Sequence, residues 1–227
     1  MASAVPRMQT MTRSGTRSGR FALAMVAVLL LAGCKVLTVE ENRRLKAAAG
    51  QGFDAVALVD HDWQSKIMPA VTQGAVPFGD LANAARAGQL NAFGAAHGHR
   101  PSDTSAYRFL VRGQGVVAGR DLADPAGGID LRVDGVGDVR LEMGPVLIDT
   151  ALRDALPLYP FNDMPDQMAF GAVASQLNLH ALGQTRPVAA HLAPGSVVSF
   201  IGAVRAPQEP GEGWRVVPVR LAAGAAL

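Results

Sequence analysis

The sequence predicts an α+β protein in which an N-terminal helical segment precedes a small β domain. Apolar residues recur every three or four positions up to about residue 105 and every second position after it, which indicates helices and then strands. The β domain has the order strand, strand, strand, helix, strand, strand, as in a five-stranded antiparallel OB-like β-barrel with its helix between strands three and four. Glycines 113, 115 and 119 within the long first strand fit the sharp bend of such a barrel. A plain antiparallel sheet covered by a helix has the same order and remains an alternative.

The first expected helix covers residues 53–67. Asp54 is its expected N-cap, and Pro69 is expected to end it because the residue before a proline avoids the α region. The spacing of three and four places one apolar face along this helix, formed by Phe53, Val56, Val59, Trp63 and Ile67.

Two shorter helices are expected before the sheet. One begins at the capping residue Asp80 and ends at Ala87, and the other covers residues 90–96. Residues 98–105 have the composition of a loop and form the expected boundary. We therefore expect a lipid anchor and helical segment over residues 34–105 and the OB-like domain over residues 106–227. Whether the helical segment packs on the barrel remains open.

Three strands are expected next, over residues 107–112, 129–134 and 139–143, each with one buried and one solvated face. The segment DGVGD, residues 134–138, joins the last two as a hairpin, because glycine supplies positive φ. A helix follows, with Pro165 near its start and Gly183 just past its end. The last two strands are expected around residues 196–204 and 214–221.

The only cysteine of the chain, Cys34, follows a short apolar run near the N-terminus. Four arginines precede this run, which covers the 12 residues 21–32 and is too short to span a bilayer, since a spanning helix needs about 20. A basic segment, a short apolar segment and a small-residue exit describe a secretory signal. The sequence LAGC at residues 31–34 resembles the bacterial lipobox, which implies a signal peptide over residues 1–33.

The lipobox resemblance implies that the Cys34 thiol is diacylated and that the new N-terminus is acylated, with fatty acids such as palmitate. Several acyl chains hold a protein at the membrane, because each buried methylene contributes about 0.8 kcal/mol. We therefore expect a lipid-anchored protein of the bacterial cell envelope that faces the periplasm and has the membrane as a partner through Cys34. The residue after the cysteine is Lys35 rather than aspartate, and resemblance to enterobacterial sorting signals implies that the protein is not retained at the inner membrane, although which membrane holds it remains open.

The charge of the mature chain argues against nucleic-acid binding. The full chain has 21 basic and 19 acidic residues, and removal of the four signal arginines leaves 17 against 19. A nucleic-acid-binding protein needs a surplus or cluster of Lys and Arg, which this chain lacks. Disulfides are also not expected, because no cysteine follows Cys34.

Several short motifs lack the residues that their chemistry requires. The glycines of residues 113–119 are followed by another expected strand, whereas a dinucleotide site needs a helix there. His97 and His99, like His61, lack the further ligands of a zinc site. The hairpin 134–138 has two carboxylates but no third oxygen ligand for calcium. No serine-hydrolase or metalloprotease motif is present. We therefore expect no catalytic residue, no metal and no cofactor.

Four further segments carry a family resemblance: GPVLIDTALRDALPLYPFNDMPDQMAFGAVASQLN at 144–178, FDAVALVDHDWQSKIMPAV at 53–71, YRFLVRGQGVV at 107–117, and VSFIGAV at 198–204 with WRVVPVRL at 214–221. Together they resemble a bacterial family of predicted periplasmic lipoproteins of unknown function. The resemblance implies a gene that lies beside sugar ABC-transport genes. It also implies an additional hairpin aspartate where this chain has Val136, so calcium binding is less favoured.

The densest set of hydrogen-bonding side chains among apolar residues lies in the longest of these segments. One hypothesis is a groove that binds sugar hydroxyls and stacks an aromatic ring on a sugar face. The alternative is structural: Arg153 pairs with Asp154, and Asn162 and Asp163 cap the following helix. The candidate contacts are Arg153, Asp154, Tyr159, Phe161, Asn162, Asp163 and Gln167.

We expect a non-catalytic accessory or interaction lipoprotein whose partner is an envelope protein or a component of a sugar importer. A periplasmic module for small carbohydrates is the alternative, and an unrecognised hydrolase is the third hypothesis. Only 5% of the chain is aromatic, which favours protein contacts over sugar stacking. The sequence leaves the ligand, the partner and the oligomeric state open.

Overall fold

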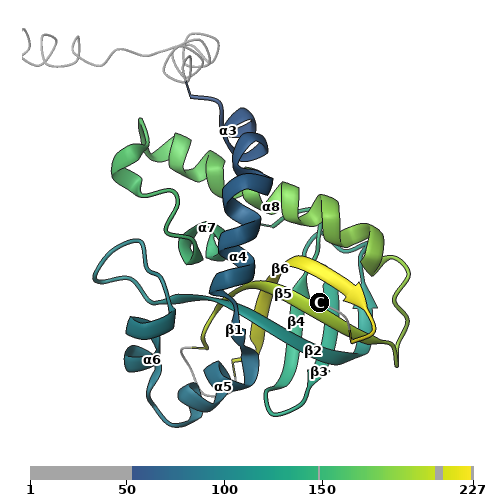
Figure 1. Cartoon of the computed structure of the whole chain (residues 1–227). Coiled ribbons are helices and arrows are strands. Elements are labelled where there is room, and N and C mark those ends of the chain that lie inside the picture. Colours follow the sequence, from purple (N-terminus) through teal and green to yellow (C-terminus); the bar gives the residue numbers. More distant parts are fainter. Residues whose placement is uncertain (1–52, 148, 208–211, 226–227) are drawn as a thin grey trace, which may run out of the picture. The chain divides into compact units, whose positions relative to one another are not determined.

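The structure is a computed structural model that describes residues 53–147, 149–207 and 212–225. Cys34 and the predicted signal peptide lie outside the described residues. Gly52–Leu227 forms one compact unit, so the helices before residue 105 pack on the sheet rather than standing apart from it (Figure 1). A division into domains at residue 105 stays a prediction. Within the described ranges, no helix combines the length and apolar character needed to cross a membrane.

The sheet contains six strands in the order β1-β2-β3-β4-β6-β5. An additional pairing of β2 with β5 closes the five strands from β2 onward into a ring. The prediction of five antiparallel strands is therefore only partly correct. β4 and β6 run parallel, because a helix and β5 lie between them and provide the long crossover that parallel strands need. The sixth strand, β1, has two residues, one of them a proline, and was too short to predict. The strands are β1 (Val76–Pro77), β2 (Arg108–Asp121), β3 (Gly128–Val133), β4 (Gly137–Glu142), β5 (Val197–Arg205) and β6 (Trp214–Ala223).

β2 is the long first strand of the ring, and it pairs with β5 along its first part and with β3 along its second. Its register with β3 shifts between Val117 and Gly119, as in a β-bulge. A side chain at Gly113 would meet the Phe200 ring at 2.8 Å, and one at Gly115 would meet the Arg132 carbonyl oxygen at 2.8 Å. Phe200 lies on β5 and Arg132 lies on β3, so these two glycines allow β2 to lie close to both of its neighbouring strands.

The first helical stretch consists of α3 (Ala55–Asp62), the π-helix η1 (Trp63–Ile67) and α4 (Met68–Gly74). Asp54 caps α3 as predicted, since its carboxylate accepts from the amides of Val56 and Ala57. The prediction that Pro69 ends the helix is wrong. Met68 N–H donates to the Trp63 carbonyl, five residues back, and this wider turn accommodates the proline at the start of α4. Val56, which was expected on the buried face, is half exposed.

The next two helices are α5 (Phe78–Arg86) and α6 (Leu90–His97). The short helix at residues 90–96 is confirmed. Asp80 was predicted to cap α5 but lies in its first turn, because the helix already begins at Phe78, after Pro77. Phe78 and Leu81 are buried against the sheet, which explains the earlier start.

Between β4 and β5 the chain forms α7 (Ala151–Ala155), the 3-10 turn η2 (Phe161–Asp163) and the 23-residue α8 (Gln167–Ala189). The expected end of α8 at Gly183 is wrong, and the helix also contains Pro187. Leu182, Thr185 and Ala189 remain buried beyond that glycine. Packing of this last part against the molecule therefore outweighs the local helix-ending signals.

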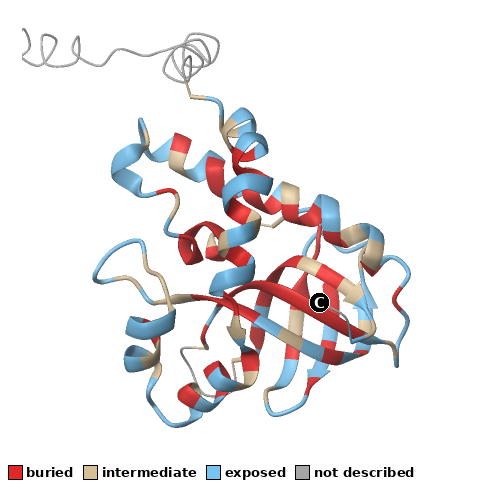
Figure 2. Cartoon of the chain, in the orientation of Figure 1, coloured by how far each residue is buried: buried red, intermediate tan, exposed pale blue. Residues whose placement is uncertain are grey.

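Two clusters of buried residues form the core. Figure 2 colours the buried residues red along the chain. One cluster fills the inside of the closed sheet and includes Phe109, Leu141 and Phe200. The other lies between the helices and the outside of β2, β5 and β6, and it includes Trp63 and Leu152. Residues 109–111 are consequently all buried, so the prediction of one wet face is wrong for the start of β2. It is confirmed for β3, whose Asp130 and Arg132 are exposed.

Candidate functional site

Arg153 and Asp154, two of the predicted contacts, form a buried ion pair on α7. Arg153 donates to Asp154 Oδ1 from its Nε at 2.8 Å and from an Nη at 2.5 Å. The guanidinium also lies 3.5 Å from the Phe170 ring centroid and donates to the Phe170 carbonyl at 3.1 Å. This arrangement attaches α7 to the start of α8.

The remaining acceptors of Asp154 are also used. Its Oδ2 accepts from the Thr150 hydroxyl at 2.7 Å, and its carbonyl oxygen lies 2.7 Å from His99 Nδ1. Few of these groups remain available to a ligand. The contacts are those of the structural alternative, in which Arg153 pairs with Asp154.

The other predicted contacts separate into one buried and four exposed side chains. Tyr159 is buried and donates to Asp62 Oδ2 at 3.2 Å. Phe161 is 49% exposed and packs edge-to-face on Phe170. Three further exposed side chains lie nearby on η2 and at the start of α8: Asn162, Asp163 and Gln167. The two cavities described below are lined by other residues.

The expected helix cap is also corrected. Asn162 and Asp163 lie on η2, and it is Asp166 that caps α8 by accepting from the Ala169 amide at 2.8 Å. Pro165 precedes the cap, so the helix cannot begin as early as Asp163 would require.

Tyr159 gives a prediction about alkaline pH. Burial raises the pKa of its phenol, and the charge and hydrogen bond of Asp62 raise this pKa further. The folded state therefore keeps the phenolic proton above about pH 10, where an unfolded chain loses it. The free energy of unfolding is expected to fall as pH rises through this range, and Tyr159→Phe is expected to reduce that fall. Urea unfolding from about pH 9 to about pH 11 tests this. An equal fall in the free energy of unfolding in the wild type and in Tyr159→Phe would contradict this prediction.

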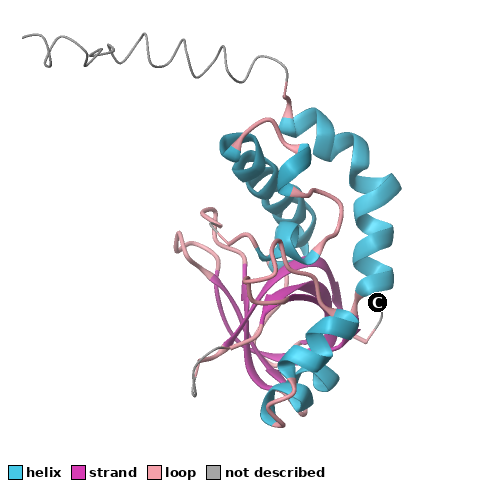
Figure 3. Cartoon of the chain, turned by 90° about the vertical axis from the view of Figure 1, so that its left-hand side faces the viewer, coloured by secondary structure: helices cyan, strands magenta, loops and turns pink. Residues whose placement is uncertain are grey.

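A groove of about 770 Å³ lies on the outer side of β3, β4 and β6. The helices pack mainly on β2, β5 and β6, and Figure 3 shows strands without a helical cover on one side of the molecule. We call this surface the charged groove. Its lining residues are Ala118, Asp130, Leu131, Arg132, Asp138, Val139, Arg140, Arg205, Glu212, Gly213, Trp214 and Arg215.

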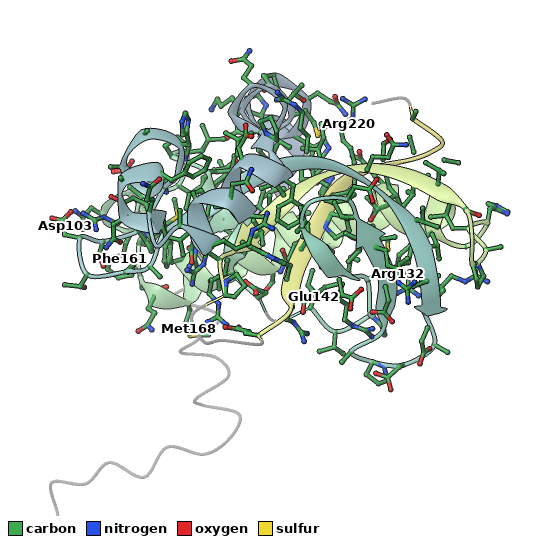
Figure 4. All side chains as sticks on the ribbon, turned by 90° about the horizontal axis from the view of Figure 1, so that it is seen from below. Asp103, Arg132, Glu142, Phe161, Met168 and Arg220 are labelled. Carbon is green, nitrogen blue, oxygen red and sulfur yellow. The ribbon has the colours of Figure 1, made fainter. Side chains whose placement is uncertain are left out.

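Opposite charges are paired along the charged groove. Arg140 donates to Asp130 at 2.7 Å across the β3–β4 ladder, and Arg205 donates to Glu212 at 3.0 Å. The Arg132 side chain is exposed (Figure 4), and no hydrogen bond or ion pair joins its guanidinium to another described residue. The groove therefore presents both signs of charge on strands that fix their positions, together with one free guanidinium.

Among the described residues, Trp214 is the only aromatic side chain that lines the groove. It is 9% exposed, and its ring packs edge-to-face on Phe78 with 5.1 Å between centroids. Stacking of a sugar or a base needs an open ring face. The charged groove lacks such a face among the described residues.

The histidine pair of the sequence lies at another cavity, of about 540 Å³, lined in part by His97 and His99. His99 Nδ1 is occupied by the Asp154 carbonyl. Over the described part of the chain, no group of three or more His, Cys, Asp or Glu residues is placed to hold a metal ion.

Comparison with solved structures identifies the fold class. An OB-fold protein from Thermotoga maritima superposes with a TM-score of 0.58 at 16% identity, over 76% of this chain and 99% of its own. Two OBodies bound to hen egg-white lysozyme, at 17% and 16% identity, cover 52% and 55% of this chain and 97% and 92% of theirs. Their TM-scores of 0.28 and 0.27 are too low to support an inference.

A family model described as "Predicted periplasmic lipoprotein (DUF2291)" matches residues 24–222. The chain belongs to this family of predicted periplasmic lipoproteins, as its sequence resemblance implied. A search of curated proteins gives no match. Family membership supports a lipid-anchored protein that faces the periplasm.

Proposed function

We propose that this lipoprotein is non-catalytic and binds an envelope protein through the charged groove, while acylated Cys34 holds it at the membrane. The observation that carries the proposal is the groove itself, about 770 Å³ in volume and lined by four arginines and three carboxylates. The partner that complements it is a polar protein segment with both signs of charge. Such complementarity favours specificity and correct register more than raw affinity.

The groove suits a protein better than a carbohydrate. Arginine is common in protein interfaces, where its planar guanidinium makes several directed hydrogen bonds. The buried ring of Trp214 leaves no face for sugar stacking, which weighs against the carbohydrate alternative. We extend the proposal to a component of a sugar importer, because the family resemblance implies that gene neighbourhood.

A photocrosslinking amino acid in place of Arg132 tests this proposal in the full-length lipoprotein, produced in its own bacterium. The Arg132 side chain is exposed and unpaired among the described residues, so its replacement breaks no side-chain hydrogen bond or ion pair there. Irradiation is expected to give one discrete protein adduct, identified by mass spectrometry.

The matched control carries the crosslinker in place of Asp103, an exposed loop residue at the opposite end of the view in Figure 4. It is expected to give no such adduct. The absence of a discrete adduct from position 132, or the same adduct from position 103, would contradict the proposal.

A further inference from the structure

One side of the long helix α8 is covered neither by the sheet nor by the other described helices. The opposite side of α8 packs on β6. Met168 is 67% exposed and Leu179 is 57% exposed, although both are large apolar residues. Spacings of three and four place five exposed residues on this uncovered side, which we call the α8 face. The α8 face consists of Met168, Ala172, Ser175, Leu179 and Gly183.

The α8 face carries no charge. Among the 23 residues of α8, Arg186 is the only Asp, Glu, Lys or Arg, and its guanidinium donates to the carbonyls of Met143 and Leu122. His180 lies on the side of the helix that meets α3, where its ring stacks on Trp63 with 4.6 Å between centroids. The exposed side of a surface helix normally carries charged residues. An uncharged apolar face of this kind marks a surface that another apolar surface covers.

The first described helix, α3, adds to this surface. α3 packs on α8, and the two helices lie at the same end of the molecule in Figure 1. Val56, in the first turn of α3, is 50% exposed. It lies one turn before Asp60, whose carboxylate contacts His180 on α8. The carboxylate of Asp54, the cap of α3, already accepts from two backbone amides. An apolar side chain of α3 is therefore available close to the α8 face.

The connection from the expected lipid anchor enters the described chain at the start of α3. Residues 35–52 separate Cys34 from Phe53, which directly precedes the cap of α3. These 18 residues span at most about 65 Å when fully extended. A tether of this length holds the folded part at a high effective concentration near the bilayer. The bilayer is therefore the apolar surface that is always within reach of α3 and α8.

We propose that the α8 face, together with Val56, rests on the bilayer that holds the anchor. The apolar side chains enter the boundary between headgroups and acyl chains, as in helices that lie on a membrane surface. The α8 face has no cation, so neutral lipid is sufficient. The inference rests on the lipid anchor of the proposed function. It goes beyond the proposed partner, which occupies the charged groove on strands that α8 does not cover.

A dye on single cysteines tests this orientation in proteoliposomes of the full-length lipoprotein. The sulfur of acylated Cys34 is not free, so an introduced cysteine is the only one to take the dye. An NBD dye is attached to Val56→Cys, Met168→Cys or Leu179→Cys, in neutral phosphatidylcholine vesicles with or without a doxyl-labelled lipid. At all three positions the emission is expected to be shifted to the blue and to be lost in the presence of the doxyl lipid.

The matched control is Gln89→Cys, in the exposed connection between α5 and α6. Figure 1 shows this connection at the end of the molecule opposite α3 and α8. The dye at position 89 is expected to keep the emission of a water-exposed group and to show no quenching by the doxyl lipid.

Met168→Asp combined with Leu179→Asp places two charges on the α8 face. Both side chains are exposed, so the unfolding midpoint is expected to stay that of the wild type. Read through the dye at position 56, the double variant is expected to lose the quenching by the doxyl lipid. Gln184→Asp is its control, because it adds a charge to another exposed side of α8 and should leave that quenching unchanged.

Three outcomes would overturn the proposal. Unshifted emission at positions 168 and 179 would show that the α8 face stays in water. A blue shift without quenching would place a second copy or another protein on it. Quenching at position 56 that the double variant does not reduce would show that the α8 face does not hold the molecule to lipid.

Failures of the underlying proposals give different results. A protein that does not float with the vesicles would overturn the anchor and, with it, this inference. A missing adduct from the crosslinker at position 132 would overturn the protein partner alone, because the dye measurements contain no other protein.

Discussion

Replacement of Cys34 by serine is expected to eliminate the lipid anchor. The wild-type chain is expected to carry fatty acyl groups on its first mature residue and to enter the detergent phase in a Triton X-114 partition. The Cys34→Ser chain has no thiol to acylate, so its intact mass should show no acyl addition. The loss of membrane affinity is expected to be large, because each acyl methylene buried in lipid contributes about 0.8 kcal/mol.

Lys35→Ala is the matched control, since it changes the neighbouring residue and keeps the thiol. It should retain both the acylated mass and the detergent partition. If Cys34→Ser kept the mass additions and the partition of the wild type, Cys34 would not be the site of lipid attachment.

Replacement of Arg153 by methionine is expected to cause a large loss of stability. It leaves the Asp154 carboxylate buried on α7 without its counter-ion. Breaking a buried pair in this way typically costs about 3–5 kcal/mol. The free energy of unfolding, measured in urea on the full-length protein, is expected to fall by that amount.

Arg100→Met is the control, because Arg100 pairs with the fully exposed Asp103 and such pairs contribute about 0–1 kcal/mol. The double variant Arg153→Met with Asp154→Leu should recover much of the loss, since no charge then remains buried. If Arg153→Met cost no more than Arg100→Met, the pair would not hold the fold together. A ligand-binding role would then be the better account.

The parts of the fold that the sequence predicted well have regular local patterns. Strict alternation predicted β3, β4 and their hairpin, where Gly135 and Gly137 adopt the expected positive φ. Helix ends were less predictable. Pro69 and Gly183 are local helix-ending signals, and each was outweighed by tertiary contacts or by a π-turn that no local pattern reveals.

The candidate site was less predictable than the fold. Arg153 and Asp154 were predicted because hydrogen-bonding side chains are dense in their segment of the sequence. In the structure, these two residues join α7 to α8. The charged groove instead combines β3 and β4 with Arg205 and residues 212–215, a proximity set by the parallel pairing of β4 and β6. One signal was present in the sequence: the hairpin register places Asp130 opposite Arg140 on one face. The alternation of apolar and polar residues along β3 and β4 indicated a solvated face but not a groove.

A charge-swapped groove tests the central claim of partner binding most directly. Asp130→Arg combined with Arg140→Asp keeps an ion pair across the β3–β4 ladder but reverses the pattern that a partner meets. The measurement is the yield of the adduct from the crosslinker at position 132, in variants with equal unfolding midpoints. We expect the swap to reduce this yield by about tenfold or more, because like charges then face each other across the interface. An unchanged yield would contradict binding through the charged groove.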